Sequence, residues 1–456
     1  MDIMENTFAL YNLKKISLTF FVFSTIATSQ SNASEYITEK THNHNQKQSS
    51  WVVLPYIFSS DSMGLTTGAV GIFDGYIQPQ MTMVATVFVG EELDVTSEVD
   101  GDNKEERTAG AMFALSGYKP PLTDRVFITM LGAYAYYPNQ RLYLDGSNDS
   151  IRDLESNDPK NTSPLQTQGY SNWFEADFRY VLPLGESTDN ALPIIQLDRG
   201  IAVNRDNVGG GTPFSTGQTI LGTELFYSKW TADKFAEEPV INTNGIRFYL
   251  EHDNTDYPAN PARGYHFNAQ FSVDLGIGNS TQSWNAIELD YAHYIELNDF
   301  SWTRQNVIAF NVWSAYSPSW DQSESLQEGG GVLDKHQTPM WEGARLGGWN
   351  KMRAYDSNRF NDKAALYGTV EYRVIPDFNP LRDNKWSPFP IDWFQTVFYI
   401  EVGRVAEQYE LDSLLSDMKY DVGFSLRALA ANVPVRFEMA FGEEGSAMWV
   451  MLNQPF

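Results

Sequence analysis

Polar and apolar side chains alternate along most of the chain, starting at Trp51. In the segment 173–180, charged residues fall on every second position and apolar residues on the positions between them. Such alternation places the two kinds of side chain on opposite faces of a β-strand. Strands of soluble proteins usually run for about 5–6 residues, whereas a tilted strand that crosses a membrane needs about 9–11. Because the alternating segments have roughly the longer length, they favour membrane-crossing strands.

Sixteen segments, separated by clusters of Gly, Asn, Asp and Pro, fit this pattern. The predicted strands are 51–59, 64–73, 82–90, 109–118, 125–137, 173–184, 220–230, 244–252, 264–275, 284–297, 304–317, 365–376, 393–405, 420–430, 434–442 and 447–456. An even number suits a single-chain outer-membrane barrel whose two termini lie on the periplasmic side. We therefore predict an all-β fold, a transmembrane antiparallel β-barrel of about 16 strands.

This topology also predicts which connections face outward. The segments 91–107, 138–170 and 318–364 follow odd-numbered strands and are expected to be outer loops. The segments 185–219 and 377–392 should be short periplasmic turns, yet both are long. The strand boundaries beside these two connections stay open at this point.

The N-terminal region has the order of features found in an export signal. Lys14 and Lys15 precede an apolar run over 16–28, and small residues follow at 31–33. The alternative is an N-terminal amphipathic helix. We expect a signal peptide over 1–33, a flexible leader over 34–50 and an outer-membrane β-barrel over 51–456.

The last strand carries a terminal aromatic residue. Phe456 lies on the same alternate face as Leu452, Val450 and Met448, and this pattern resembles the C-terminal recognition signal of outer-membrane barrels. Pro455 departs from the pattern because it removes one donor from the strand ladder. The resemblance implies recognition by the barrel assembly machinery during biogenesis.

The segment 318–364 contains a glycine pair followed by an arginine. Gly347 and Gly348 precede Arg353, Ala354 and Tyr355. This motif resembles the Gly-Gly…Arg-Gly-Phe/Tyr signature in the sixth outer loop of the BamA/TamA-like bacterial surface antigen barrels, a superfamily that includes two-partner-secretion transporters. The strands 368–373 and 398–405 and the hairpin 253–264 also resemble family segments in the expected order. The resemblance implies a long sixth outer loop that folds into the barrel.

An arginine inside a barrel needs carboxylate partners, because an unpaired buried charge is costly. We expect Arg353 to pair with Glu401, with Glu371 as a second acceptor, so that the loop is locked to the lumen wall. Alternation points Tyr399, Glu401 and Gly403 inward. The alternative is a solvated loop arginine and an unrelated lumenal acid. Ala354 replaces the family's glycine, which disfavours a left-handed turn at that position.

Composition and the absence of known motifs argue against several kinds of binding and catalytic site. The chain has 32 Lys and Arg against 58 Asp and Glu, a formal net charge of −26, so nucleic acid is a poor partner. It has no cysteine, no Gly-x-Ser-x-Gly nucleophile elbow and no His-Glu-x-x-His zinc motif. The glycine-rich segment 208–219 lacks the lysine of a phosphate-binding loop. We expect no enzymatic activity, no cofactor and no metal centre.

The resemblance implies a role in protein translocation or assembly, or in outer-membrane organisation. Family transporters carry periplasmic POTRA modules, and the leader 34–50 is too short for one, so we expect a member that lacks them. The alternative is a passive, porin-like diffusion channel. The expected partners are outer-membrane lipid and a polypeptide or lipid client. The acidic segment 91–107 is expected to be solvated or to bind divalent cations beside lipopolysaccharide.

Overall fold

The computed structural model describes most of the chain after the predicted leader. The described residues are 39–41, 50–60, 63–96, 103–121, 123–143, 146–147, 165–205, 208–209, 212–231, 240–325, 333–381, 391–430 and 433–456. The predicted signal peptide lies outside them. No helix in these ranges is both long and apolar enough to cross a membrane.

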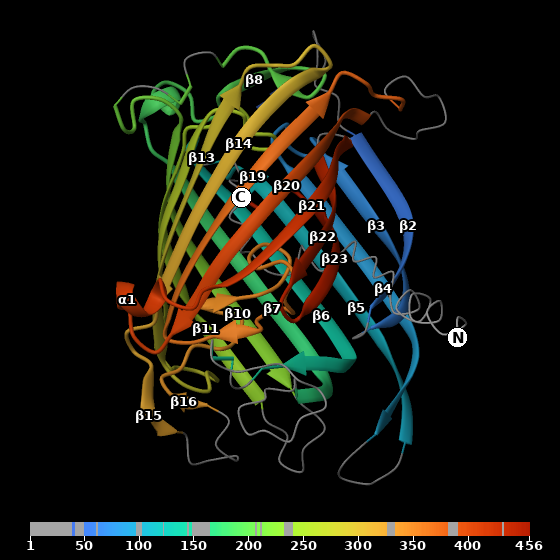
Figure 1. Cartoon of the computed structure of the whole chain (residues 1–456), viewed down its shortest axis with the longest axis vertical. Helices are drawn as coiled ribbons and strands as arrows, with labels where there is room; N and C mark the ends of the chain where they lie inside the picture. Colours follow the sequence, from blue (N-terminus) through green and yellow to red (C-terminus); the bar gives the residue numbers. More distant parts are fainter. Residues whose placement is uncertain are drawn as a thin grey trace, which may run out of the picture.

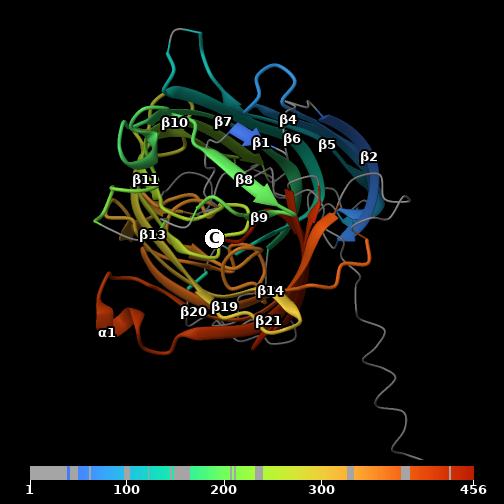
Figure 2. The same ribbon diagram turned by 90° about the horizontal axis from the view of Figure 1, so that it is seen from above.

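Sixteen long strands form one antiparallel sheet in which every strand pairs with its neighbours in the sequence. They are β2 (Ser50–Ser60), β3 (Gly64–Asp74), β4 (Thr82–Thr96), β5 (Asn103–Tyr118), β6 (Val126–Leu142), β7 (Leu165–Val181), β10 (Gln218–Thr231), β11 (Val240–Asp253), β12 (Gly264–Asp274), β13 (Trp284–Leu297), β14 (Thr303–Tyr316), β19 (Ala364–Pro376), β20 (Ile391–Ala406), β21 (Lys419–Ala430), β22 (Val433–Gly442) and β23 (Gly445–Leu452). The strands are tilted and the sheet curls into a ring, so the predicted barrel of 16 strands is confirmed (Figures 1 and 2).

The burial of the strand faces identifies the side that contacts lipid. In β13 the acids Glu288 and Asp290 are buried, whereas Ile287, Leu289 and Tyr291 are more than 40% exposed on the other face. A soluble sheet normally buries its apolar face and exposes its polar one. The reversed arrangement is that of a membrane barrel, with an apolar outer surface and a polar lumen.

The two edge strands of the sheet are β2 and β23. In the part of the chain that the structure describes, the backbone ladder ends at these two strands and no pairing joins them. We call the junction between these two unpaired edges the seam. The predicted last strand, 447–456, is wrong at its end, because β23 stops at Leu452. Asn453 has a left-handed φ of 63°, and Pro455 has no N–H for a ladder.

The connection between β7 and β10 is not a short turn. It carries η2 (Gly185–Ser187), β8 (Ile194–Asp198) and β9 (Ile201–Ala202), and β8 and β9 lie across one end of the ring (Figure 2). Side chains of the rim hold it there: Arg304 Nη2 donates to Asp198 O at 3.3 Å, and Trp393 Nε1 donates to Gly200 O at 3.0 Å. This connection covers the predicted periplasmic end.

A strand from the predicted leader joins this covering sheet. β1 (Glu39–Thr41) pairs with β8 in parallel, so part of the region 34–50, predicted to be flexible, is held against the barrel. Two predicted outer loops are also shorter than expected, because β4 and β5 extend into 91–107 and β6 and β7 extend into 138–170. In the other long connection, residues 382–390 lie outside the described residues.

The sixth outer loop comprises residues 317–363, between β14 and β19. Its described part contains two small antiparallel pairs, β15 (Asp321–Ser325) with β16 (Asp334–Lys335) and β17 (Arg345–Leu346) with β18 (Phe360–Asn361). Several residues in and near its motif are almost completely buried, namely Met352, Arg353, Arg359 and Phe360. The predicted inward-folding loop is therefore present.

Candidate functional site

The motif of the sixth outer loop forms a tight turn that depends on left-handed backbone. Gly347 and Gly348 have φ values of 104° and 113°, and a Cβ on Gly347 would collide with the carbonyl oxygen of Asp356. The N–H of Gly348 donates to Tyr355 O at 3.0 Å and closes the turn. Both positions therefore require glycine.

Met352, which precedes Arg353, has a left-handed backbone with a φ of 54°. Ala354, where the family has glycine, is not left-handed, so its side chain costs no backbone strain. The turn presents Arg353 at its tip, and Ala354 packs close to Gly442, where an ideal Cβ would lie 3.0 Å from the Ala354 Cβ.

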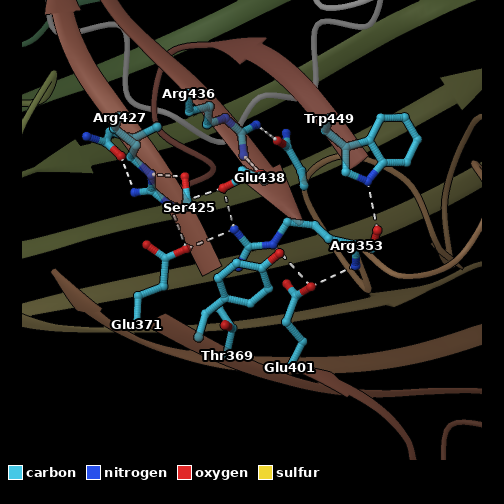
Figure 3. Close-up of polar contacts among 12 residues, drawn as sticks. Arg353, Thr369, Glu371, Glu401, Ser425, Arg427, Arg436, Glu438 and Trp449 are labelled. Carbon is cyan, nitrogen blue, oxygen red and sulfur yellow. Dashed lines mark hydrogen bonds and ion pairs between the residues drawn. The ribbon is translucent and has the colours of Figure 1, made fainter. Parts of the chain in front are cut away.

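Arg353 is completely buried and lies among three carboxylates of the lumen wall (Figure 3). Its Nε lies 3.1 Å from Glu401 Oε2 of β20, and its Nη1 lies 3.0 Å from Glu371 Oε1 of β19 and 2.8 Å from Glu438 Oε1 of β22. The structure thus brings Arg353 together with both acids predicted from the sequence and with a third.

The backbone around Arg353 is held as firmly as its side chain. The Arg353 N–H donates to Glu401 Oε2 at 2.7 Å, and the Ala354 N–H donates to Asp421 Oδ2 at 3.0 Å. Trp449 Nε1 of β23 donates to Arg353 O at 2.7 Å (Figure 3). The guanidinium also stacks on Tyr399, with 3.5 Å between its Cζ and the ring centroid.

A wider network of alternating charges surrounds this contact. Glu371 also pairs with Arg373 at 2.8 Å and Arg427 at 3.0 Å, and Glu438 also pairs with Arg427 at 3.2 Å and Arg436 at 2.5 Å. All of these side chains are at most 1% exposed. Because burying an unpaired charge is costly, loss of one member should disturb its neighbours.

Three further contacts attach the loop to other parts of the barrel. Arg359 forms a two-pronged pair with Glu444 at the tip of the β22–β23 hairpin. Glu342 accepts from Arg247 Nη2 of β11 at 3.0 Å. On a third side, Tyr143 Oη donates to Asp356 Oδ2 at 2.7 Å. The loop therefore crosses the lumen and is attached to well-separated strands.

Several of these residues were not predicted as parts of the site. Alternation places Arg436 and Glu438 on the charged face of their strand, but nothing in the sequence aligns that strand with the loop. Asp421 and Trp449 give no signal beyond alternation. The structure places the remaining predicted residue, Phe456, away from the loop motif, in the lumen beside Tyr294 and Arg373.

Among the described residues, no group of three or more His, Asp or Glu side chains is arranged to hold a metal ion. The arrangement at Arg353 is a set of ion pairs and hydrogen bonds between a loop and a wall. Its chemistry is that of a non-covalent attachment that can be made or broken.

The chain was compared with protein families and with known proteins. The model of the Omp85 superfamily domain matches residues 217–446, just over half of the chain. No curated protein matches. A solved structure that is similar is BamA from Haemophilus ducreyi lacking POTRA domains 1–3, with 11% sequence identity, a TM-score of 0.44, and coverage of 88% of this chain and 69% of that one. The chain belongs to the Omp85 superfamily and is an outer-membrane β-barrel.

Proposed function

We propose that this barrel translocates or assembles polypeptides in the outer membrane and is not a passive diffusion channel. The observation that carries the proposal is the sixth outer loop, which crosses the lumen and is attached at Arg353, Arg359 and Glu342. A diffusion channel works through a permanently open lumen. A lumen crossed by an attached segment favours a barrel that acts by changing conformation.

The position of the seam supports the same role. Unpaired backbone donors and acceptors inside a membrane cost several kcal/mol each, so a strand edge in lipid seeks a partner. The lumenal loop contacts the hairpin that forms one side of this seam, through Glu438 and Trp449. A movement of the loop would therefore be transmitted to β22 and β23, where a polypeptide strand could pair with the barrel.

A reversible cross-link between the loop and this hairpin tests the proposal. The ideal Cβ of Gly442 lies 3.0 Å from the Ala354 Cβ, slightly below the roughly 3.5–4.5 Å of a disulfide, so a small adjustment would allow the bond. Because the chain has no cysteine, the Ala354→Cys/Gly442→Cys variant gives a single defined cross-link. The two single-cysteine variants are the matched controls.

The readout is the census of outer-membrane proteins and lipids in cells whose only copy of the gene is the variant. Deletion of the gene should change the census, the oxidised double variant should reproduce the deletion, and a reductant should restore the normal census. An unchanged census on deletion would eliminate the assembly role. In planar bilayers the wild type should conduct little or flicker, whereas a large and steady cation-selective conductance would support the porin-like alternative.

We also infer that residues 1–33 are a cleaved signal peptide, from their basic, apolar and small-residue order. The mass of the protein purified from outer membranes tests this inference. A mature chain that begins at Ser34 is the expected result, and a retained Met1 would contradict it.

A further inference from the structure

The segment 453–456, called the tail below, leaves the sheet and enters the lumen. The Asn453 N–H makes a last backbone hydrogen bond to Pro434 O at 2.8 Å, and its left-handed φ of 63° turns the chain inward. The end of the chain lies within the outline of the barrel in both views (Figures 1 and 2). Gln454, Pro455 and Phe456 are all buried.

Phe456 lies in a pocket formed by strands that are not neighbours of its own strand. Its ring stacks on Tyr294 of β13 with 6.2 Å between centroids, and the guanidinium of Arg373 of β19 lies 4.8 Å from its centre. Small apolar side chains complete the pocket, namely Ala262, Ala292, Val307 and Ala309. A ring that is stacked and covered by a cation gains specific stabilisation in addition to burial.

Side-chain contacts hold the part of the tail beyond Asn453. Gln454 Oε1 accepts from Arg427, and its Nε2 donates to Ala259 O at 3.2 Å, in the turn between β11 and β12. These contacts join the tail to β21 and to that turn. Attachment through a few side chains, without a strand ladder, can be released without breaking the sheet.

The pocket also contains unused hydrogen-bond donors. Arg373 is 1% exposed and donates through Nε to Glu371 at 2.8 Å, but its Nη1 and Nη2 have no acceptor among the described residues. A buried guanidinium without acceptors for two of its nitrogens is costly. A carbonyl or carboxylate oxygen that arrives beside the aromatic ring would satisfy these donors.

We infer that this pocket is a binding site for an extended polypeptide segment that carries an aromatic side chain and a nearby oxygen acceptor, and that the tail is its displaceable resident. Tyr294 and the small apolar side chains would bind the aromatic ring of this segment. Arg373 would donate hydrogen bonds to its oxygen acceptor. Displacement of the tail would release the end of β23 beside the seam. This inference does not depend on the proposed cellular role, because binding is measured with the purified protein.

The test uses a fluorescent peptide with the sequence of residues 448–456 and the same peptide with its final Phe replaced by Ala. The full-length Gln454→Ala/Phe456→Ala variant should bind the first peptide saturably, and the wild type should bind it far more weakly because its own tail competes. In that variant background, Tyr294→Ala should weaken binding about threefold to tenfold, whereas Tyr294→Phe, which keeps the ring, should leave it nearly unchanged. Folding of each variant is checked by its migration in SDS gels without boiling.

A second measurement keeps the native Gln454 and Phe456. Pro455→Cys introduces the only thiol of the chain at a buried position of the tail. Excess peptide should raise the rate at which a maleimide labels this thiol, and the Phe-to-Ala peptide should not. The inference is overturned if the emptied variant does not bind the peptide, if both peptides bind equally, or if the labelling rate does not respond.

Discussion

Arg359 of the sixth outer loop and Glu444 of the β22–β23 hairpin form a parallel two-pronged ion pair, with 2.8 Å from Nε to Oε2 and 2.7 Å from Nη2 to Oε1. The Arg359 side chain is fully buried and that of Glu444 is 12% exposed. Such a fork fixes the orientation of both groups, which a lysine cannot reproduce. The pair therefore sets where the tip of the hairpin lies relative to the loop.

Arg359→Lys should lower the stability of the barrel even though the charge is kept, because one prong is lost. Arg359→Ala should cost more, on the order of 3–5 kcal/mol, because Glu444 is left without its partner. The temperature at which the compact form disappears from unboiled SDS gels measures both effects. Equal temperatures for the lysine variant and the wild type would contradict the requirement for a fork.

Arg353→Ala should destabilise the barrel by a similar amount, about 3–5 kcal/mol, and raise its conductance in planar bilayers, because three buried carboxylates lose their shared guanidinium. The matched control is Arg107→Ala. Arg107 also pairs with a glutamate, Glu92, but both side chains are about half exposed, so its loss should cost no more than about 1 kcal/mol. If the two variants behave alike, the lumenal pair does not fasten the loop.

Gly347→Ala should distort the loop motif, because its φ of 104° is left-handed and the added Cβ would meet the Asp356 carbonyl. Ala354→Gly, which restores the family's residue, should have little effect, because Ala354 is not left-handed. The temperature at which the compact form disappears from unboiled SDS gels is measured for both variants. A stabilising effect of Ala354→Gly larger than about 1 kcal/mol would show that the alanine is strained.

Stability should also depend on pH through Asp256, in the turn between β11 and β12. Burial raises the pKa of Asp256 to about 6, although the N–H groups of Ala262 and Arg263 donate to its Oδ1 at 2.8 and 3.2 Å and oppose the rise. The unfolded chain ionises this group near pH 4, so its contribution to stability is present at low pH and is lost as the pH rises through about 6.

Asp256→Asn keeps the oxygen that accepts both bonds but cannot ionise. We therefore expect its stability relative to the wild type to increase between pH 5 and pH 8, by roughly 1–1.5 kcal/mol. Asp256→Ala, which removes the acceptor, should be destabilised at both pH values. The measurement is the temperature at which the compact form disappears from unboiled SDS gels at the two pH values. A difference between Asp256→Asn and the wild type that does not change with pH would contradict the raised pKa of Asp256.

The sixteen strands could be predicted because lipid and lumen impose opposite demands on alternate residues, and this constraint is visible along each strand separately. Glu401 could be chosen for the same reason, since alternation points it inward. The connection that carries β8 and β9 could not be recognised as a covering sheet. Its strands are short, and what orders them is contact with Arg304 and Trp393, which are far away in the sequence.

For the acids around Arg353, the sequence predicts which side chains point into the lumen but not which of them contact the arginine. Alternation identifies Glu371, Glu401 and Glu438 equally as lumenal, but their distance from the arginine depends on the register between β19, β20 and β22. Likewise Phe456 has the pattern of a strand residue, yet the left-handed Asn453 turns it away from the sheet. Register and local backbone turns are set by packing across the whole barrel.

The parallel pairing of β1 with β8 has a consequence for the order of folding. It joins Glu39 to Ile194, residues separated by 194 − 39 = 155 positions, whereas each barrel hairpin joins strands that are adjacent in sequence. Contacts between distant residues form late, because the entropy of closing a long loop is lost before the contact is gained. The end of the barrel that β8 and β9 cover therefore stays accessible while the first strands assemble, and the segment that precedes the barrel is among the last parts to be secured.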